Sequence, residues 1–225
     1  MALILNIDTS IETASICLST DGTALSVIQN EDQKNHAAWL HTSIEKIIHD
    51  AGYVMKDLQA VAVTSGPGSY TGLRVGMAAA KGLCYALHIP FITENTLKIM
   101  AMGTQKQAMK FAASLICPMI DARRMEVYTA LYTIDMKELV APAAMILHKN
   151  SFEEYLSQQK MVFSGSGVSK WREIMTNPGA YFVNNPVLAG YLGNISHNKY
   201  LTQEFTDLIY SEPMYIKEFY THGKK

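Results

Sequence analysis

The sequence predicts an α/β fold of two related lobes, and three observations support this prediction. Apolar segments of strand length alternate with segments of helical periodicity, in the order β-β-β-α-β-α-β over residues 3–94. The segment MIDARRMEVYTALYT (119–133) aligns without a gap on NIDTSIETASICLST (6–20), mostly in pattern rather than identity. The chain has 225 residues, which is enough for two small lobes with buried cores.

The first lobe contains most of the secondary-structure signal. From apolar runs and alternation, strands are expected at residues 3–8, 13–19, 22–29, 58–65 and 90–94. Helices are expected at 35–51, which Gly52 can terminate, and at 72–87, after the glycine-rich loop TSGPGSYTGLRVG. Because strands and helices alternate beyond residue 35, we expect the later strands to pair in parallel through right-handed crossovers.

The second lobe is predicted to be a reduced copy of the first. It opens with a strand that ends at Asp121, followed by a second strand and a turn. The segment MVFSGSG (161–167), a short helix at 168–175, a turn-rich stretch at 176–186 and a last helix at 200–210 follow. We place the first lobe at residues 1–103 and the second at 104–200, and we expect the C-terminal segment 200–218 to pack back on the first lobe.

Composition and charge exclude several classes of protein. The net charge is −1, and the tail HGKK is the main basic cluster, so we expect any contact with nucleic acid to need a partner. The three cysteines are scattered, which argues against a disulfide framework and a thiolate zinc site and fits the cytoplasm. The start of the chain lacks the pattern of a signal peptide, and the most apolar helix carries Arg74 and Lys81 and is too short to span a bilayer.

The glycine-rich loop at 64–76 allows two interpretations. Backbone N–H groups in such a loop, followed by a helix N-terminus, can hold a phosphate, but the pattern matches neither common phosphate-binding motif and Pro67 lacks an N–H. Alternatively, Gly66 and Gly68 adopt unusual backbone angles, and the i, i+4, i+8 stripe of small residues at 72, 76 and 80 lets another element approach closely. From spacing alone, close packing is favoured.

Other candidate sites are ambiguous in the same way. The segment Asp8–Ser10 could hold a metal-bound phosphate, or its side chains could satisfy the N–H groups of a turn. Asp121 and Arg123 could likewise be functional, or could pin the two lobes together. His36 and His41 are five residues apart, whereas two ligands on one helix face need a separation of four. Serines 65 and 69 lie outside any nucleophile-elbow motif, so a hydrolase has no support.

Taken together, five segments resemble the TsaB family. They are ILNIDTSIETASICL, QKNHAAWLHTSIEKIIHDAG, AVAVTSGPGSYTGLRVGMAAAKGLCYAL, CPMIDARRMEVYTALY and EPMYIKEF. The block SGPGSYTGLR beside the opening IDTS is the most specific part, and the likeness is strongest over about the first 130 residues. It implies a two-lobed fold of the actin/sugar kinase/Hsp70 kind with ribonuclease H-like lobes. The stretch 176–200 departs from the family pattern, which puts the surface that meets TsaE in doubt.

The resemblance also implies a function. TsaB-like proteins are non-catalytic partners of TsaD-like proteins, which share the fold and carry the metal and the active site. With the ATPase TsaE, the pair serves threonylcarbamoyl transfer to N6 of the tRNA adenosine next to the anticodon. The His-x-x-x-His pair that binds metal in TsaD-like proteins is absent, since the position four residues after His36 is Leu40 and not histidine. We therefore expect no catalytic or metal-binding residue, no cofactor of its own, and contact with tRNA only through the complex.

The resemblance also points to two sets of site residues. In this family the helices at 35–51 and 72–87 pack against their equivalents in TsaD, and without that partner we expect them to form a homodimer. Candidates for this interface are His36, Trp39, Leu40, Leu73, Arg74, Met77 and Lys81. Candidates for a relic nucleotide site are Asp8, Thr9, Ser10, Gly66 and Gly68.

Two other functions stay open at this point. The first is a stand-alone ATP-dependent kinase or nucleotidase acting on a small molecule, which would need a working phosphate cradle. The second is a metallopeptidase-like hydrolase, suggested only by analogy with the superfamily, which would need bound metal.

Overall fold

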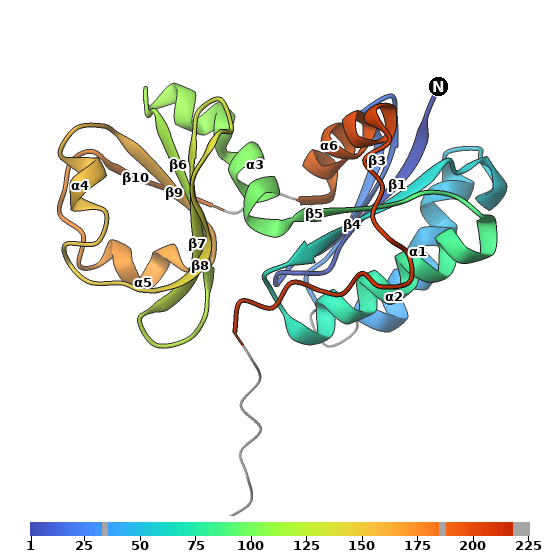
Figure 1. Cartoon of the computed structure of the whole chain (residues 1–225), viewed down its shortest axis with the longest axis horizontal. Coiled ribbons are helices and arrows are strands. Elements are labelled where there is room, and N and C mark those ends of the chain that lie inside the picture. The colour runs from blue at the N-terminus through green and yellow to red at the C-terminus, as the bar shows by residue number, and fades with distance from the viewer. Residues whose placement is uncertain (33–35, 185–187, 218–225) are drawn as a thin grey trace, which may run out of the picture.

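The computed structural model describes residues 1–32, 36–184 and 188–217, and it consists of two lobes side by side. Each lobe is built on a five-stranded mixed sheet (Figure 1). The helix α3 (Thr96–Lys110) leads from the first sheet to the second and lies between them. The predicted two-lobed α/β fold is confirmed.

The first sheet has the strand order β3-β2-β1-β4-β5. Its strands are β1 (Leu3–Asp8), β2 (Ala14–Thr20), β3 (Thr23–Asn30), β4 (Ala60–Gly66) and β5 (Phe91–Asn95). The first three pair antiparallel, with Leu5 opposite Leu18, whereas β1, β4 and β5 pair in parallel. As expected from the alternation of side chains in a strand, Leu3, Leu5 and Ile7 of β1 face one core and Ile4 faces another.

The second sheet repeats this topology. Its strands are β6 (Leu115–Asp121), β7 (Glu126–Thr133), β8 (Glu138–Ile146), β9 (Met161–Ser164) and β10 (Ala180–Val183), in the order β10-β9-β6-β7-β8. Counted from the first strand of each lobe, both sheets therefore read 3-2-1-4-5. The repeat extends to the glycine loops, since Gly66 at the end of β4 and Gly165 directly after β9 both have positive φ angles, of 117° and 113°.

Helices cover the two sheets unequally. The helices α1 (His36–Asp50) and α2 (Tyr70–Leu87) cover one face of the first sheet, and α6 (Leu188–Thr202) covers the opposite face (Figure 1). The second sheet packs one face against α3, and the described helices on its other face are the short α4 (Glu153–Leu156) and α5 (Val168–Arg172). A short 3-10 helix, η2 (Met55–Asp57), precedes β4. The reduction predicted for the second lobe thus lies in its helices.

The structure differs from the predicted boundaries in three places. Residues 103 and 200 both fall inside helices, and α6 covers the first sheet although most of it was assigned to the second lobe. Between residues 203 and 217 the structure has no helix, because Gln203 adopts a left-handed backbone with φ of 57° and ends α6. The stretch predicted as turns contains β10, which pairs in parallel with β9.

The C-terminal segment 206–217, which we call the strap, lies against the first lobe. The Thr206 N–H donates to Phe91 O at 2.8 Å, and the Met214 N–H donates to Ser65 O at 2.6 Å. At its far end the Lys217 ammonium bonds to Glu126 of the second lobe at 2.6 Å. The strap therefore contacts both lobes. Among the helices that the structure describes, none could span a membrane.

Candidate functional site

Asp8 lies at the end of β1, and its carboxylate accepts hydrogen bonds from the turn that follows. One carboxylate oxygen, Oδ1, accepts hydrogen bonds from the Ser10 N–H, the Ser10 hydroxyl and the Thr64 hydroxyl, at 3.1, 2.5 and 2.7 Å. The other oxygen is buried without a hydrogen-bond partner. Burial raises the pKa of Asp8, and the bonds from Ser10 and Thr64 offset only part of this effect. This geometry favours the interpretation in which the side chains of Asp8–Ser10 satisfy a turn.

Other residues of the chain occupy the space beside the glycines of the loop at 66–68. A Cβ on Gly68 would lie 2.2 Å from Ser10 O, and a Cβ on Gly66 would lie 2.5 Å from Met214 O of the strap. The Ser69 N–H donates to Ser10 O at 2.7 Å, so this donor points into the turn. Thr9 is buried beneath the loop as well. Three of the five residues predicted as a relic nucleotide site, Asp8, Thr9 and Gly66, are therefore enclosed by the chain itself.

The two serines considered as nucleophiles have structural roles. The Ser65 hydroxyl donates to Glu94 O at 3.1 Å. The Ser69 hydroxyl accepts from the Gly72 N–H at 3.3 Å and caps α2. All three cysteines are free and buried, and burial raises the pKa of each to about 12. None of these groups is arranged as an activated nucleophile.

The small-residue stripe of α2 packs on its own sheet. A Cβ on Gly72 would lie 1.9 Å from Thr9 O, and a Cβ on Gly76 would lie 2.3 Å from the Thr9 hydroxyl oxygen. That hydroxyl donates to Gly72 O at 2.7 Å, which holds the helix and the turn together. Ala80 on the same stripe is fully buried. The sequence allowed either phosphate binding or close packing for this region, and the stripe is used for close packing within the first lobe.

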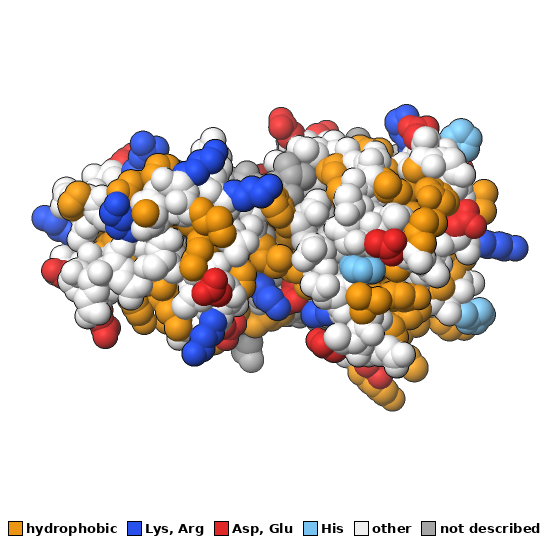
Figure 2. Space-filling view, turned by 90° about the horizontal axis from the view of Figure 1, so that it is seen from above, with side chains coloured by type: hydrophobic (Ala, Val, Ile, Leu, Met, Phe, Trp, Pro, Cys, Tyr) orange, Lys and Arg blue, Asp and Glu red, His pale blue; other side chains and the backbone are white. Residues whose placement is uncertain are grey.

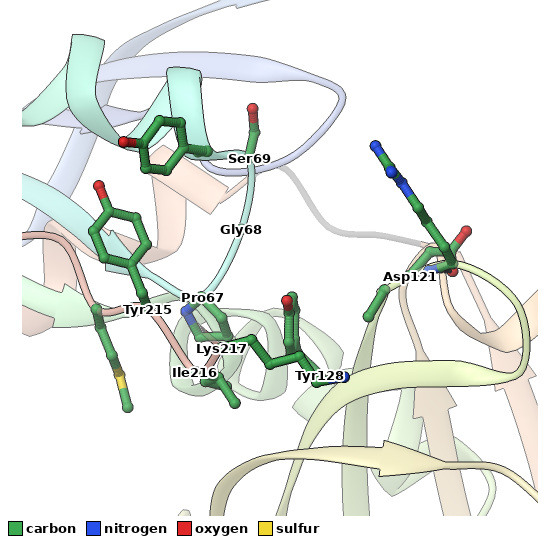
Figure 3. A pocket seen from close by; sticks show the side chains of 12 residues that line it. Pro67, Gly68, Ser69, Asp121, Tyr128, Tyr215, Ile216 and Lys217 are labelled. Carbon is green, nitrogen blue, oxygen red and sulfur yellow. Dashed lines mark hydrogen bonds between the residues drawn. The ribbon is translucent and has the colours of Figure 1, made fainter. Parts of the chain in front are cut away.

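A cleft separates the two lobes beside the glycine loop. Two adjoining hollows of about 530 and 760 Å³ share Gly68, Ser69, Asp121, Arg123 and Tyr128 in their walls. Figure 3 shows the loop at Pro67–Ser69 on one side, Asp121 on the other, and Tyr215 to Lys217 of the strap along a third wall. Of the predicted nucleotide-site residues, Ser10 and Gly68 border these hollows, and Asp8, Thr9 and Gly66 are not in their walls.

Asp121 does not pin the lobes together. Its carboxylate accepts from the Arg123 N–H at 2.8 Å and pairs with Lys170, and both partners belong to the second lobe. Burial opposes ionisation, but the bonds from Lys170 and the Arg123 N–H outweigh it and lower the pKa of Asp121. A charged contact between the lobes is instead made by Lys217 and Glu126.

The outward side of α1 and α2 contains an apolar groove. It has a volume of about 470 Å³ and is lined by Ala37, His41, Val75, Ala78, Ala79, Gly82 and Leu83. A Cβ on Gly82 would meet no atom within 4 Å, so the floor of the groove is open at this point. Small residues on a helix let the backbone of a second helix come close. The groove can therefore accept a helix.

The structure corrects part of the predicted partner interface. Leu40, Leu73 and Met77 are 0%, 0% and 4% exposed. Leu40 and Met77 belong to the core of the first lobe, and Leu73 lies against Gly66, where a Cβ on that glycine would be 3.2 Å from it. Trp39 is half-buried against the same core.

Two more of the predicted interface residues, Arg74 and Lys81, have partners within the chain. Arg74 is exposed, bonds to the Tyr215 hydroxyl at 3.0 Å and lies over the Tyr70 ring, whereas Lys81 holds the strap. The side chain of His36 lies outside the described residues. Sequence reasoning missed Ala37, Ala78 and Gly82, whose exposed positions on the two helices it did not separate from the inward ones.

Comparisons with known proteins agree on one relationship. Residues 25–218 match the family model described as TsaD: tRNA N6-adenosine threonylcarbamoyltransferase. The chain is 28% identical to the Escherichia coli "tRNA threonylcarbamoyladenosine biosynthesis protein TsaB" over 221 residues, 95% of this chain and 94% of that protein. The Bacillus subtilis protein of the same name is 36% identical over 129 residues, 57% of this chain and about half (54%) of that protein.

A solved structure has the same architecture. It is described as an uncharacterized Pseudomonas aeruginosa protein with similarity to peptidase YEAZ, and it superposes with a TM-score of 0.81 at 25% identity. The superposition covers 96% of this chain and 100% of that one.

Proposed function

This chain belongs to the TsaD family and resembles its TsaB members, and on that premise we propose that it is a non-catalytic subunit of a tRNA-modifying complex. In this proposal it acts in threonylcarbamoyladenosine biosynthesis, in the cytoplasm, by binding a TsaD-like catalytic protein. The partner transfers the threonylcarbamoyl group to N6 of the tRNA adenosine next to the anticodon. ATP, Mg²⁺ and any metal belong to the TsaD-like and TsaE-like partners.

The observation that carries this proposal is the apolar groove between α1 and α2. Its floor is made of small residues on two long helices, and Gly82 leaves room for a further side chain or backbone. A partner of the same family would bring a related helix pair, so four helices could pack along their lengths. The same face would join two copies of this chain when the partner is missing, and we propose this homodimer as the free form.

Two further features support a role without catalysis. Asp8, Thr9 and Gly66 are buried within the chain, and Met214 of the strap closes over Gly66. The net charge of −1 also fits contact with tRNA through the complex, and on the face seen in Figure 2 the Lys and Arg side chains are scattered among Asp and Glu. A protein that holds nucleic acid by itself would usually concentrate basic side chains on one face.

The test is a binding and activity measurement with the TsaD-like protein from the same organism. Light scattering on gel filtration should show a homodimer of this chain converting to a 1:1 complex with the partner. Isothermal titration should give an affinity, and adding this chain should stimulate threonylcarbamoyl transfer by the partner with its ATPase. No complex and no stimulation would refute the proposal.

The groove itself is tested with a matched pair of variants. In Gly82→Leu the new side chain fills the groove, and we expect at least about a hundredfold weaker binding with unchanged folding. The control is Gln107→Leu, which adds the same side chain to an exposed position on α3, and its affinity should match the wild type. Equal affinity of Gly82→Leu and the wild type would move the interface elsewhere.

A further inference from the structure

Three large apolar side chains are unusually exposed at one place on the first lobe. Tyr85 of α2 is 75% exposed, and Ile209 and Tyr210 of the strap are 76% and 82% exposed. Among the described large apolar side chains, only Met1 is exposed to a similar degree. A cluster of this kind is costly in water and typically marks a contact surface.

The strap brings Ile209 and Tyr210 alongside α2, the helix that carries Tyr85. The Lys81 ammonium donates to Ile209 O at 3.2 Å and to Ser211 O at 2.9 Å, and Tyr85 lies one helical turn beyond Lys81. Further along, Tyr215 of the strap bonds to Arg74. Since 209–211 lie beside residue 81 and 215 beside residue 74, the strap runs antiparallel to α2, as Figure 1 shows.

The exposed part of the strap is held in place by its own hydrogen bonds. The Asp207 carboxylate accepts from the N–H groups of Ile209 and Tyr210, both at 2.7 Å. On one side of this turn the Thr206 hydroxyl accepts from the Thr93 N–H at 3.0 Å, and on the other the Met214 N–H donates to Ser65. A surface that is already ordered loses little conformational entropy when a partner binds.

The strap and the groove between α1 and α2 both lie beside the outward side of α2. Ala78, Gly82 and Tyr85 are exposed and spaced at i, i+4 and i+7, so they form one outward stripe of α2. The groove lies on the α1 side of this stripe, and the strap, tied to Lys81 and Arg74, lies along α2 as well. A helix seated lengthwise on the stripe can contact both.

We propose that Tyr85, Ile209 and Tyr210 form a second contact area for the same TsaD-family partner, beside the groove. This inference rests on the proposed function, and it adds the strap to the interface. The polar groups of the patch favour an apolar occupant, because the Lys81 ammonium and the Asp207 carboxylate already have partners within the chain. We therefore assign the patch to large apolar side chains on a partner helix rather than to nucleic acid.

The test is the double variant Ile209→Ser with Tyr210→Ser, titrated with the TsaD-like protein. Both side chains lie mainly in solvent, and the hydrogen bonds of this turn use their backbone, so the melting temperature should match the wild type. We expect the dissociation constant to rise at least about tenfold, as for other interface anchors. The control is Ile146→Ser, an apolar residue 57% exposed on β8 of the second lobe, which should bind like the wild type.

The outcomes separate this inference from the proposed function. If Gly82→Leu loses binding and the strap variant keeps it, the strap has no place in the interface and the proposed function stands. If the strap variant changes only self-association, the patch serves a second copy of this chain and the inference is wrong. If the wild type does not bind the TsaD-like protein at all, the proposed function fails first.

Discussion

The two sides of α2 carry similar small residues and have opposite surroundings. On the inner side, Gly72 and Gly76 touch the buried turn at Thr9, where even one added carbon would collide with it. On the outer side, Ala78 and Gly82 are exposed, and an added carbon at Gly82 meets nothing. Small residues at helical spacing therefore indicate close approach without telling which neighbour approaches. In this chain the inner stripe packs against the first lobe, and Ala78 and Gly82 of the outer stripe are exposed among the described residues.

The strongest test of this contrast places a charge on the inner side. In Leu73→Asp the new carboxylate would replace a side chain that is fully buried in the first lobe. We expect a loss of about 4 kcal/mol or more in the free energy of unfolding, with loss of the folded first lobe rather than of partner binding alone. Urea denaturation followed by circular dichroism measures it. A stable Leu73→Asp protein that merely fails to bind would place Leu73 on the outside.

A single methyl group tests the inner side more finely. In Gly72→Ala the added carbon would lie 1.9 Å from a backbone oxygen of Thr9, which cannot move without shifting the turn. We expect a loss of about 3 kcal/mol in the free energy of unfolding. Urea denaturation of the variant and the wild type gives the difference. A neutral Gly72→Ala would mean that α2 lies farther from β1 than in this structure.

The turn beneath α2 is tested through the pH dependence of stability. Burial raises the pKa of Asp8 in the folded state above its ordinary value of 3.8, so stability is full below that value and falls as the pH rises through the folded pKa. Asp8→Asn has no carboxyl to ionise, so it does not lose stability in this way as the pH rises. Its free energy of unfolding relative to the wild type should rise from pH 4 to pH 8, by about 1.4 kcal/mol for each unit of pKa shift.

Asp121, at the equivalent position of the second lobe, provides the control. Its pKa is lowered, so its contribution is present above the ordinary value and is lost as the pH falls through the folded pKa. Asp121→Asn should therefore show a slope of the opposite sign, and a shallow one because the side chain is 46% exposed. Because Asp121 titrates below its ordinary value of 3.8, Asp121→Asn is denatured between about pH 2 and pH 4 and Asp8→Asn between pH 4 and pH 8, and slopes of equal sign would contradict the comparison.

The smallest expected effect is on the outer side. Gly82→Ala adds a carbon where no atom lies within 4 Å, and alanine is the better helix former. We expect a gain of about 1 kcal/mol in the free energy of unfolding, the reverse of Gly72→Ala in the same helix. Thermal denaturation of both variants side by side gives the sign of each change. A destabilised Gly82→Ala would show that the outer side is already covered.

Local pattern was sufficient to predict the parts of the fold that depend on neighbours in sequence. The opening strands follow from apolar alternation, and the ungapped match of Asp121 on Asp8 predicted two lobes that share one topology. The sequence pattern could not assign α6 to the first lobe, because the contacts of α6 with the first sheet join residues that are far apart in sequence. The same limit applies to β10, whose four residues are defined mainly by pairing with β9.

The candidate site was predictable only in part. The glycine loop and the two helices were identified, but Leu73 and Met77 were assigned to the surface and are buried. Large apolar residues on a helix suit a core and an interface equally well, so residue type alone does not separate them. The outer groove is lined largely by small residues, which have little sequence signal.

The position of α6 also determines the order in which the two lobes can finish folding. The sheet of the first lobe is made from residues 3–95, but one of its faces is covered by residues 188–202. The strands of the second lobe come from one continuous stretch between these two parts. During synthesis from the N-terminus, the second lobe can therefore finish folding first, while the first lobe keeps an apolar face bare until α6 leaves the ribosome. The lobe that begins the chain is the last to close.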